Sequence, residues 1–299
     1  MPKQPMAEVF GFAIDDFSPH AEHFRANRLC PFNNKVPNCT KDKVEDPLGV
    51  CSVYEGNNAV VTCPIRFRQD WLMASDAAAF FFPAGTHWTS LTEVRLNDKN
   101  GKSAGNIDIV LVSYDQAGRI TDFGSLEVQA VYISGNIRKA FAYYMENPRE
   151  RANMDWSKGK NYPHPDYLSS SRKRLAPQLI YKGGILHAWG KKQAVAVDRH
   201  FFSTLPRMEE VDPADAELAW LIYDLENTGG QKRLVRSRTV YTRFRFALER
   251  ITTAEPGNVQ DFIDALQERL DKKVVVGNGT AGEAPPDALT LQDILGSGE

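Results

Sequence analysis

The four cysteines of this chain are confined to one short segment, and that segment constrains the fold more than any other feature of the sequence. Cys30, Cys39, Cys51 and Cys63 follow the spacing C-x8-C-x11-C-x11-C, and no cysteine follows them. Prolines and glycines surround the four, which is typical of a loop folded around an ion rather than of a hydrophobic core. We therefore predict an N-terminal helix and a four-cysteine metal-binding module over residues 1–70.

The chemistry of this module depends on the compartment. The N-terminus leads into no apolar stretch long enough for a secretory signal, and no apolar run approaches the length of a membrane span. We expect a cytoplasmic protein with no membrane partner, in which clustered thiols bind metal rather than form disulfides. Four thiolates in a tetrahedral array suit Zn²⁺ or iron, and such a closed site has a structural role. Four buried free thiols, or two disulfides in an oxidising compartment, are the alternatives.

A second group of polar residues lies downstream, within segments that otherwise have the composition of β-strands. Asp108 opens an apolar run, and Glu127 and Gln129 sit two residues apart in a second run after a turn signal. Residues i and i+2 of a strand share a face, so Glu127 and Gln129 project together, and an antiparallel hairpin brings Asp108 beside Glu127. Two adjacent carboxylates suit Mg²⁺, which also takes water and substrate phosphate as ligands. The alternative is an ordinary hairpin with solvent-facing acids, although an acid in an apolar strand is costly unless it is paired.

Together, the two groups resemble the NotI family of type II restriction endonucleases. The similarity covers about residues 28–140, and it combines two independent sets of motifs in the expected order. The cysteine segments that carry it are CPFNN (30–34), VPNCTK (36–41), PLGVCS (47–52) and CPIRF (63–67). The acidic segments that carry it are WTSLTEVRL (88–96), GNID (105–108) and LEVQAVY (126–132).

The resemblance implies an α/β fold of the PD-(D/E)xK endonuclease type, a mixed sheet flanked by helices, with an N-terminal iron-binding module. It also implies Mg²⁺-dependent double-strand cuts in GC-rich palindromic DNA, with a GGCC-centred site as one candidate, and 5′-phosphate products. The expected partners are double-stranded DNA, a second copy in a homodimer and a cognate DNA methyltransferase, all in the bacterial cytoplasm. Zinc remains the alternative to iron, because iron rests on the resemblance alone.

The positions that match the family motifs define the implied active site. These are Glu93, Asp108, Glu127 and Gln129, with Asp108 and Glu127 as Mg²⁺ ligands. Most members of the wider nuclease superfamily have Glu-x-Lys where this chain has Glu127-x-Gln129. Glutamine carries no charge, so a water activated by the metal, or a nearby base, has to do the work of that lysine. The structural iron would be held by Cys30, Cys39, Cys51 and Cys63.

Charge is distributed unevenly, although the net charge of −2 gives no overall argument for nucleic acid. Residues 172–199 and 231–250 each contain seven Lys or Arg against one acid, enough for a DNA-facing surface unless they are solvated faces. In the first stretch, 172–174 is expected to contact phosphates and 191–192 to form a turn. The second is strand-like, with Arg236 and Arg238 on one face and Arg243 and Arg245 on another. Arginine suits guanine in the major groove. We therefore predict DNA contacts from Arg233, Arg236, Arg238, Arg243 and Arg245.

A chain of 299 residues that is 42% apolar can build a sizeable core. We predict an endonuclease catalytic and DNA-recognition domain over residues 71–275 and a flexible Gly- and Pro-rich tail over 276–299. Helices are predicted over 71–82, 135–144, 175–190 and 256–273, strands over 106–114, 120–133, 192–205 and 216–226, and a long loop over 147–170.

Two rival functions remain open at this point. The first is a structure-selective or repair-type nuclease with the same core, and the second is a non-catalytic metal-ribbon protein that binds DNA. Incubation with phage DNA and Mg²⁺ separates the three, because they give discrete bands, a smear or only a mobility shift.

Overall fold

The computed structural model describes residues 3–43, 45–159, 161–228 and 230–276. The chain divides into two compact units, Met1–Thr253 and Ala254–Glu299. The predicted boundary at residue 70 falls within the first unit and stays a prediction, and the predicted tail lies outside the described residues except for its first position. None of the helices in the described ranges is long and apolar enough to cross a membrane.

The first unit is built on a mixed sheet of six strands in the order β12-β11-β10-β7-β6-β5. The predicted hairpin that carries the acids is confirmed, because β6 and β7 pair as antiparallel neighbours. The central strand β10 runs parallel to both β7 and β11, whereas the other pairs are antiparallel. The strands are β5 (Trp88–Asn97), β6 (Ser103–Tyr114), β7 (Ile120–Gln129), β10 (Gln193–Asp198), β11 (Leu218–Thr228) and β12 (Gln231–Thr242).

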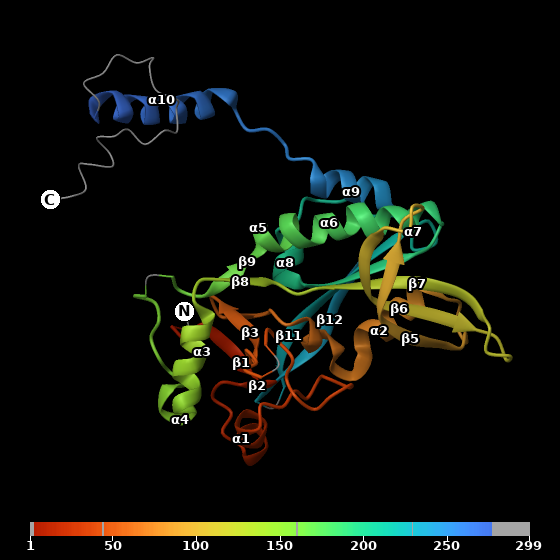
Figure 1. Cartoon of the computed structure of the whole chain (residues 1–299), viewed down its shortest axis with the longest axis horizontal. Helices are drawn as coiled ribbons and strands as arrows, with labels where there is room; N and C mark the ends of the chain where they lie inside the picture. The colour runs from red at the N-terminus through yellow and green to blue at the C-terminus, as the bar shows by residue number, and fades with distance from the viewer. Residues whose placement is uncertain (1–2, 44, 160, 229, 277–299) are drawn as a thin grey trace. The chain divides into compact units, whose positions relative to one another are not determined.

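Helices cover both faces of this sheet (Figure 1). The predicted helix at 71–82 is confirmed as α2 (Leu72–Phe81), whose apolar side packs on one face against Leu111, Leu126 and Leu221. Gly124 allows that approach, because an added Cβ there would lie 2.5 Å from the Phe81 ring. The opposite face is covered by a continuous helical segment and two short helices. These are α5 (Tyr167–Ser170), η2 (Ser171–Leu175), α6 (Ala176–Gln178), η3 (Leu179–Gly183), α7 (Gly184–Ala188), α8 (Arg199–Ser203) and α9 (Phe244–Thr252).

The cysteine segment belongs to a second, four-stranded sheet in the order β2-β1-β3-β4. Two of its strands precede the first cysteine, and β3 contains Cys51. The sequence predicted only a helix before the first cysteine. That helix exists as α1 (Pro19–Ala26), capped by the Ser18 hydroxyl, but two short strands precede it. The sheet consists of β1 (Met6–Val9), β2 (Phe12–Ala13), β3 (Val50–Glu55) and β4 (Asn58–Val61), and β4 leads into η1 (Pro64–Trp71).

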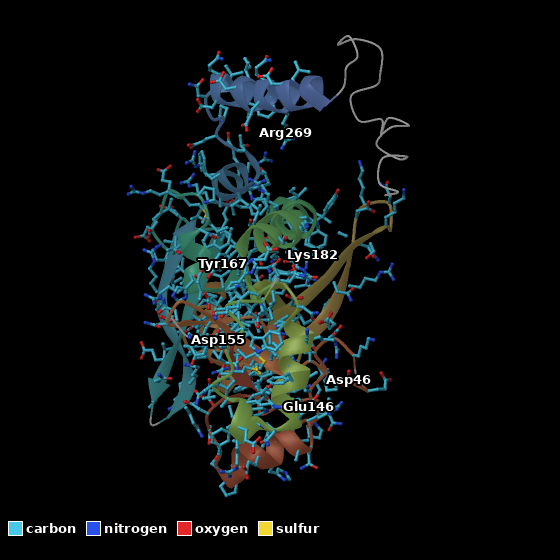
Figure 2. The ribbon with its side chains drawn as sticks, turned by 90° about the vertical axis from the view of Figure 1, so that its left-hand side faces the viewer. Asp46, Glu146, Asp155, Tyr167, Lys182 and Arg269 are labelled. Atoms are coloured by element: carbon cyan, nitrogen blue, oxygen red, sulfur yellow. The ribbon has the colours of Figure 1, made fainter. Side chains whose placement is uncertain are left out.

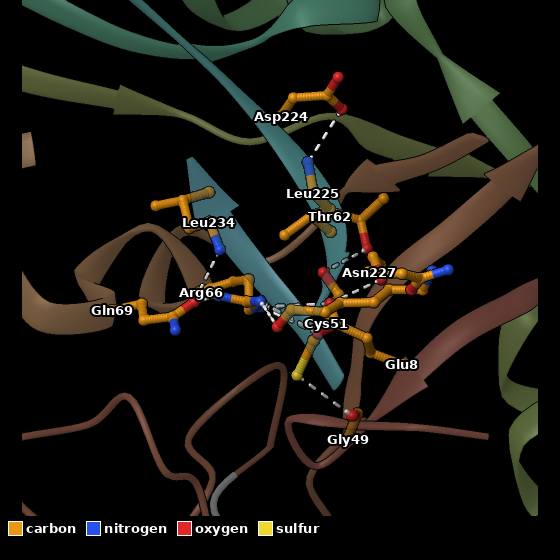
Figure 3. A network of polar contacts seen from close by, with 12 residues as sticks. Glu8, Gly49, Cys51, Thr62, Arg66, Gln69, Asp224, Leu225, Asn227 and Leu234 are labelled. Carbon is orange, nitrogen blue, oxygen red and sulfur yellow. Dashed lines mark hydrogen bonds and ion pairs between the residues drawn. The ribbon is translucent and has the colours of Figure 1, made fainter. Parts of the chain in front are cut away.

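A buried ion pair joins the small sheet to the main one (Figure 3). Glu8 of β1 lies 3.1 Å from the Arg66 guanidinium, and both side chains are fully buried. The same guanidinium donates to the Lys232 carbonyl oxygen of β12 at 2.9 Å, and the Ser52 hydroxyl donates to Glu8 at 2.7 Å. The segment that carries the cysteines is therefore fastened to the edge of the main sheet.

The structure corrects two predicted elements. The predicted strand at 192–205 ends early, because the Asp198 carboxylate accepts backbone N–H groups of His200 and Phe201 and so caps α8. The predicted loop at 147–170 contains α4 (Pro148–Arg151) and β9 (His164–Asp166), and β9 pairs with β8 (Tyr132–Ser134). The helices predicted after residue 135 and residue 256 are present as α3 (Ile137–Glu146) and α10 (Val259–Val276), the latter in the second unit.

Candidate active site and four-cysteine cavity

Three of the four predicted active-site residues lie opposite one another on adjacent strands. Glu93 of β5, Asp108 of β6 and Glu127 of β7 occupy one row across the sheet. Pairs on both sides fix the register of Glu93 with Asp108, and the pair next to Asp108 and Glu127 fixes theirs. Glu93 has a positive φ of 56°, which is unusual for a residue other than glycine and interrupts its pairing. The flanking pairs are Thr92↔Ile109, Val94↔Ile107 and Ile109↔Leu126.

The Asp108 and Glu127 carboxylates belong to the same site, and the hairpin places both on the face covered by η3 and α7. Asp108 Oδ2 accepts the Val128 backbone N–H at 2.8 Å. Glu127 is only 6% exposed, and its Oε1 is a buried atom without a hydrogen-bond partner among the described residues. Burial raises the pKa of Glu127 to about 7, and the Asp108 charge adds to the increase while the Lys182 ammonium opposes it. Glu127 is therefore a buried acid that interacts strongly with the half-buried Asp108.

Gln129 follows the predicted geometry but is engaged by the backbone. Glu127 pairs with Val195 of β10 and Gln129 with Val197, so both side chains point to the same face. Gln129 is 3% exposed, and its Nε2 donates to the Ala130 carbonyl oxygen at 2.7 Å. The side-chain oxygen of Gln129 is the part of the amide that can accept a hydrogen bond from water.

Sequence reasoning missed Lys182, which approaches the acids from η3. Its Nζ lies 2.7 Å from Glu127 Oε2 and donates to the Asn106 carbonyl oxygen at 2.7 Å. The lysine stem passes over Gly105, whose φ of +115° favours glycine. Figure 2 labels this side chain. In the sequence, Lys182 is one of the seven positive charges of residues 172–199, and no local spacing connects it to Glu127.

The described residues contain no group of three or more His, Cys, Asp or Glu side chains arranged to hold a metal ion. Glu93 therefore does not join Asp108 and Glu127 as a third converging ligand in this arrangement. The pair alone still fits Mg²⁺, because this ion takes one or two protein carboxylates and completes its shell with water and phosphate oxygens. The partnerless Glu127 Oε1 is an oxygen that such an ion could bind.

All four cysteines line one small cavity of about 10 Å³. All four are free thiols, so the alternative of two disulfides is wrong. Burial raises the pKa of Cys30 to about 11 and raises the pKa of Cys39 and Cys51, with contributions from neighbouring thiols. Thiolates, not thiols, bind metal, and a bound cation would reverse these shifts. The thiols gather as predicted, but the closed tetrahedral geometry is not found among the described residues, so the iron or zinc site stays a prediction.

The predicted arrangement of the arginines in β12 is wrong in one respect. A bulge lets Arg236 pair with Tyr223 and Arg238 with Ile222, and these neighbours on β11 point to opposite faces. Arg236 therefore reaches Asp76 of α2 at 2.7 Å, whereas Arg238 lies over the Phe202 ring on the other side.

The strand also ends before the last two predicted arginines. Arg243 precedes α9 and Arg245 lies in its first turn, where Arg245 Nε donates to the His187 ring at 3.2 Å. Arg233 stays in β12 and pairs with Asp70 at 3.3 Å. All five arginines are exposed, so their predicted role in DNA binding remains a prediction.

The fold and site define a mixed α/β protein in which a half-buried aspartate, a buried glutamate and a buried lysine meet on one face of the main sheet. The sequence model of the family described as "Restriction endonuclease NotI" matches residues 8–234, most of the chain. The chain belongs to this family, and it is a type II site-specific deoxyribonuclease, a hydrolase that binds double-stranded DNA. A comparison with curated proteins gave no match.

Proposed function

We propose that this enzyme cuts both strands of GC-rich palindromic DNA with Mg²⁺ held by Asp108 and Glu127, and that it leaves 5′-phosphate and 3′-hydroxyl ends. The observation that carries the proposal is the buried Glu127 carboxylate beside Asp108, with one oxygen that lacks a partner among the described residues. A buried carboxylate oxygen without a donor is costly, and a bound cation removes that cost.

Hydrolysis of a phosphodiester requires a positioned water, neutralised charge at phosphorus and a stabilised leaving oxygen. When bound, Mg²⁺ would supply the positive charge that activates the water, neutralises the phosphate and stabilises the leaving oxygen. Asp108 is held by the Val128 N–H through Oδ2, which leaves Oδ1 for a cation. Glu93 stands exposed at the end of the row and Gln129 is buried two residues beyond Glu127. We assign Glu93 to the open side of the site and Gln129 to the orientation of the attacking water through its amide oxygen.

The mixed sheet with helices on both faces supports a PD-(D/E)xK assignment for the core. A palindromic site implies a two-fold homodimer with one active site for each strand. The five exposed arginines of residues 233–245 are the proposed DNA contacts, for guanine or phosphate. The host requires a cognate methyltransferase to protect its own sites in the bacterial cytoplasm.

The cysteine cavity is proposed to hold a structural iron ion, with Zn²⁺ as the alternative. Its support is that four thiols, three from loops and Cys51 from β3, line one small space. The resemblance of the cysteine motifs favours iron. The ion would stabilise the segment between α1 and η1 rather than take part in hydrolysis.

Digestion of phage DNA with purified protein and Mg²⁺ tests the assignment. We expect discrete bands, and we expect Asp108→Ala and Glu127→Ala to abolish cutting while DNA binding in Ca²⁺ is retained. Asp122→Ala is the matched control, because Asp122 is an acid on the same strand as Glu127 whose side chain is 48% exposed and pairs with Lys191. A smear would favour a structure-selective nuclease, and a mobility shift alone a non-catalytic binding protein. Full cleavage by Asp108→Ala would remove the carboxylate pair from the mechanism.

A further inference from the structure

The Lys182 ammonium is buried beside the acidic pair, where a positive charge is costly unless it is paired. Lysine is almost never fully buried unless it is paired, and this side chain is 6% exposed. Its two acceptors, Glu127 Oε2 and the Asn106 carbonyl oxygen, both lie at 2.7 Å. Asn106 precedes Asp108 by two residues on β6, so the ammonium bridges the two strands that carry the acidic pair.

The fold holds this lysine firmly in place. Lys182 belongs to η3, and π-helical turns occur frequently at functional sites. The adjacent Gly183 packs so closely that an added Cβ would lie 2.7 Å from the Phe244 ring of α9. The Gln193 amide of β10 donates to the Gly183 carbonyl oxygen at 3.1 Å. Contacts with α9 and β10 thus fix the turn from which Lys182 reaches the acids.

We propose that Lys182 is the active-site lysine of this endonuclease, supplied from η3 instead of from the strand position that Gln129 occupies. One N–H of Lys182 holds Glu127 Oε2, so that Oε1 of the same carboxylate faces the place of the metal, and the positive charge of the ammonium faces the substrate phosphate. An ammonium has three N–H donors, and the third stays available to the substrate phosphate. This role rests on the proposed function, because it concerns the same carboxylates.

The competing explanation is a structural ion pair that merely fills the space between helix and sheet. The two explanations differ in whether the site needs the positive charge or only the hydrogen bonds. Lys182→Gln keeps two N–H donors and removes the charge, so the variant is expected to fold. Lys182→Arg keeps the charge in a different shape. Lys191→Gln is the matched control, because Lys191 Nζ pairs with Asp122 of the same strand β7 at 2.6 Å but has a side chain that is 30% exposed, against 6% for Lys182.

The experiment compares these variants in single-turnover cleavage with saturating Mg²⁺, after thermal melting has shown that each one folds. We expect Lys182→Gln to cleave about 100-fold more slowly, which is the lower end of the usual cost of losing one electrostatic donor at a reacting group. Lys182→Arg should recover part of the rate, and Lys191→Gln should stay within about twofold of the parent, the scatter of a surface pair. DNA affinity in Ca²⁺ should change far less than the rate.

Calorimetric titration of the DNA-free protein with Mg²⁺ provides a readout that does not depend on cleavage. Lys182→Gln keeps an N–H donor for Glu127 Oε2, so it should bind Mg²⁺ at least as tightly as the parent, because only the positive charge next to the ligands is gone. A collapsed site would instead bind the ion more weakly. The proposal is overturned if Lys182→Gln cleaves within threefold of the parent, or if its slower cleavage comes with tenfold weaker Mg²⁺ binding. A parent chain that cuts no DNA overturns the proposed function as well, whereas the other two outcomes leave that function standing.

Discussion

Replacement of Arg66 by methionine is expected to lower the free energy of unfolding by about 3–5 kcal/mol, the typical effect of removing one partner of a buried ion pair. Arg66 and Glu8 both have fully buried side chains, and the guanidinium Nε lies 3.2 and 3.1 Å from the two Glu8 oxygens. Methionine preserves most of the side-chain volume but leaves the Glu8 carboxylate buried without its counter-charge.

The size of the effect follows from the contacts that the guanidinium makes. Besides Glu8, it donates to the Gln69 side-chain oxygen at 2.7 Å and to the Lys232 carbonyl oxygen at 2.9 Å. Each buried acceptor left without a donor costs about 1–3 kcal/mol. The Ser52 hydroxyl continues to donate to Glu8, and methionine can still pack against the Phe32 ring, now 4.2 Å from the guanidinium. Because these contacts remain, the expected loss of stability stays at about 3–5 kcal/mol and does not reach the summed cost of every lost hydrogen bond.

Urea unfolding followed by tryptophan fluorescence measures this change. Arg138→Met is the matched control, because its guanidinium also bonds two acids, Asp42 and Asp46, but is 36% exposed and should cost about 1 kcal/mol or less. The double variant Glu8→Met with Arg66→Met should recover much of the loss, since no buried charge remains unpaired. If Arg66→Met loses no more stability than Arg138→Met, the buried pair does not fasten the small sheet to β12.

Two further predictions concern the acidic pair and the thiols. In metal-free buffer, the raised pKa of Glu127, about 7, means that the stability it confers is present below its unfolded pKa near 4.5 and lost as the pH rises through 7. The parent should therefore lose stability relative to Glu127→Gln between pH 5 and pH 8 in chemical unfolding, and a parallel pH dependence would contradict the assignment. Elemental analysis should find one iron or zinc ion per chain, and Cys51→Ser should lower both this content and the melting temperature without changing cleavage per folded molecule. A metal-free parent would refute the proposed thiol site.

The sequence alone determined the features that depend on local periodicity. The two-residue alternation of strands placed Glu127 and Gln129 on one face and, with the turn after Asp115, brought Asp108 beside Glu127. Good helix formers up to Pro83 predicted α2. The clustering of the cysteines in one segment likewise led to a shared cavity. All of these relationships join residues that are close in the chain or in one hairpin.

Only the tertiary structure decided the relationships that depend on how distant elements pack. Lys182 reaches Glu127 across 55 residues, and the π-helical turn that aims it leaves no regular pattern in the sequence. One extra residue in β12 separates Arg236 from Arg238, because a bulge reverses the alternation that a regular strand would have kept. Local periodicity fixes which face of an element a side chain takes, but the partner across the gap is set by packing between elements.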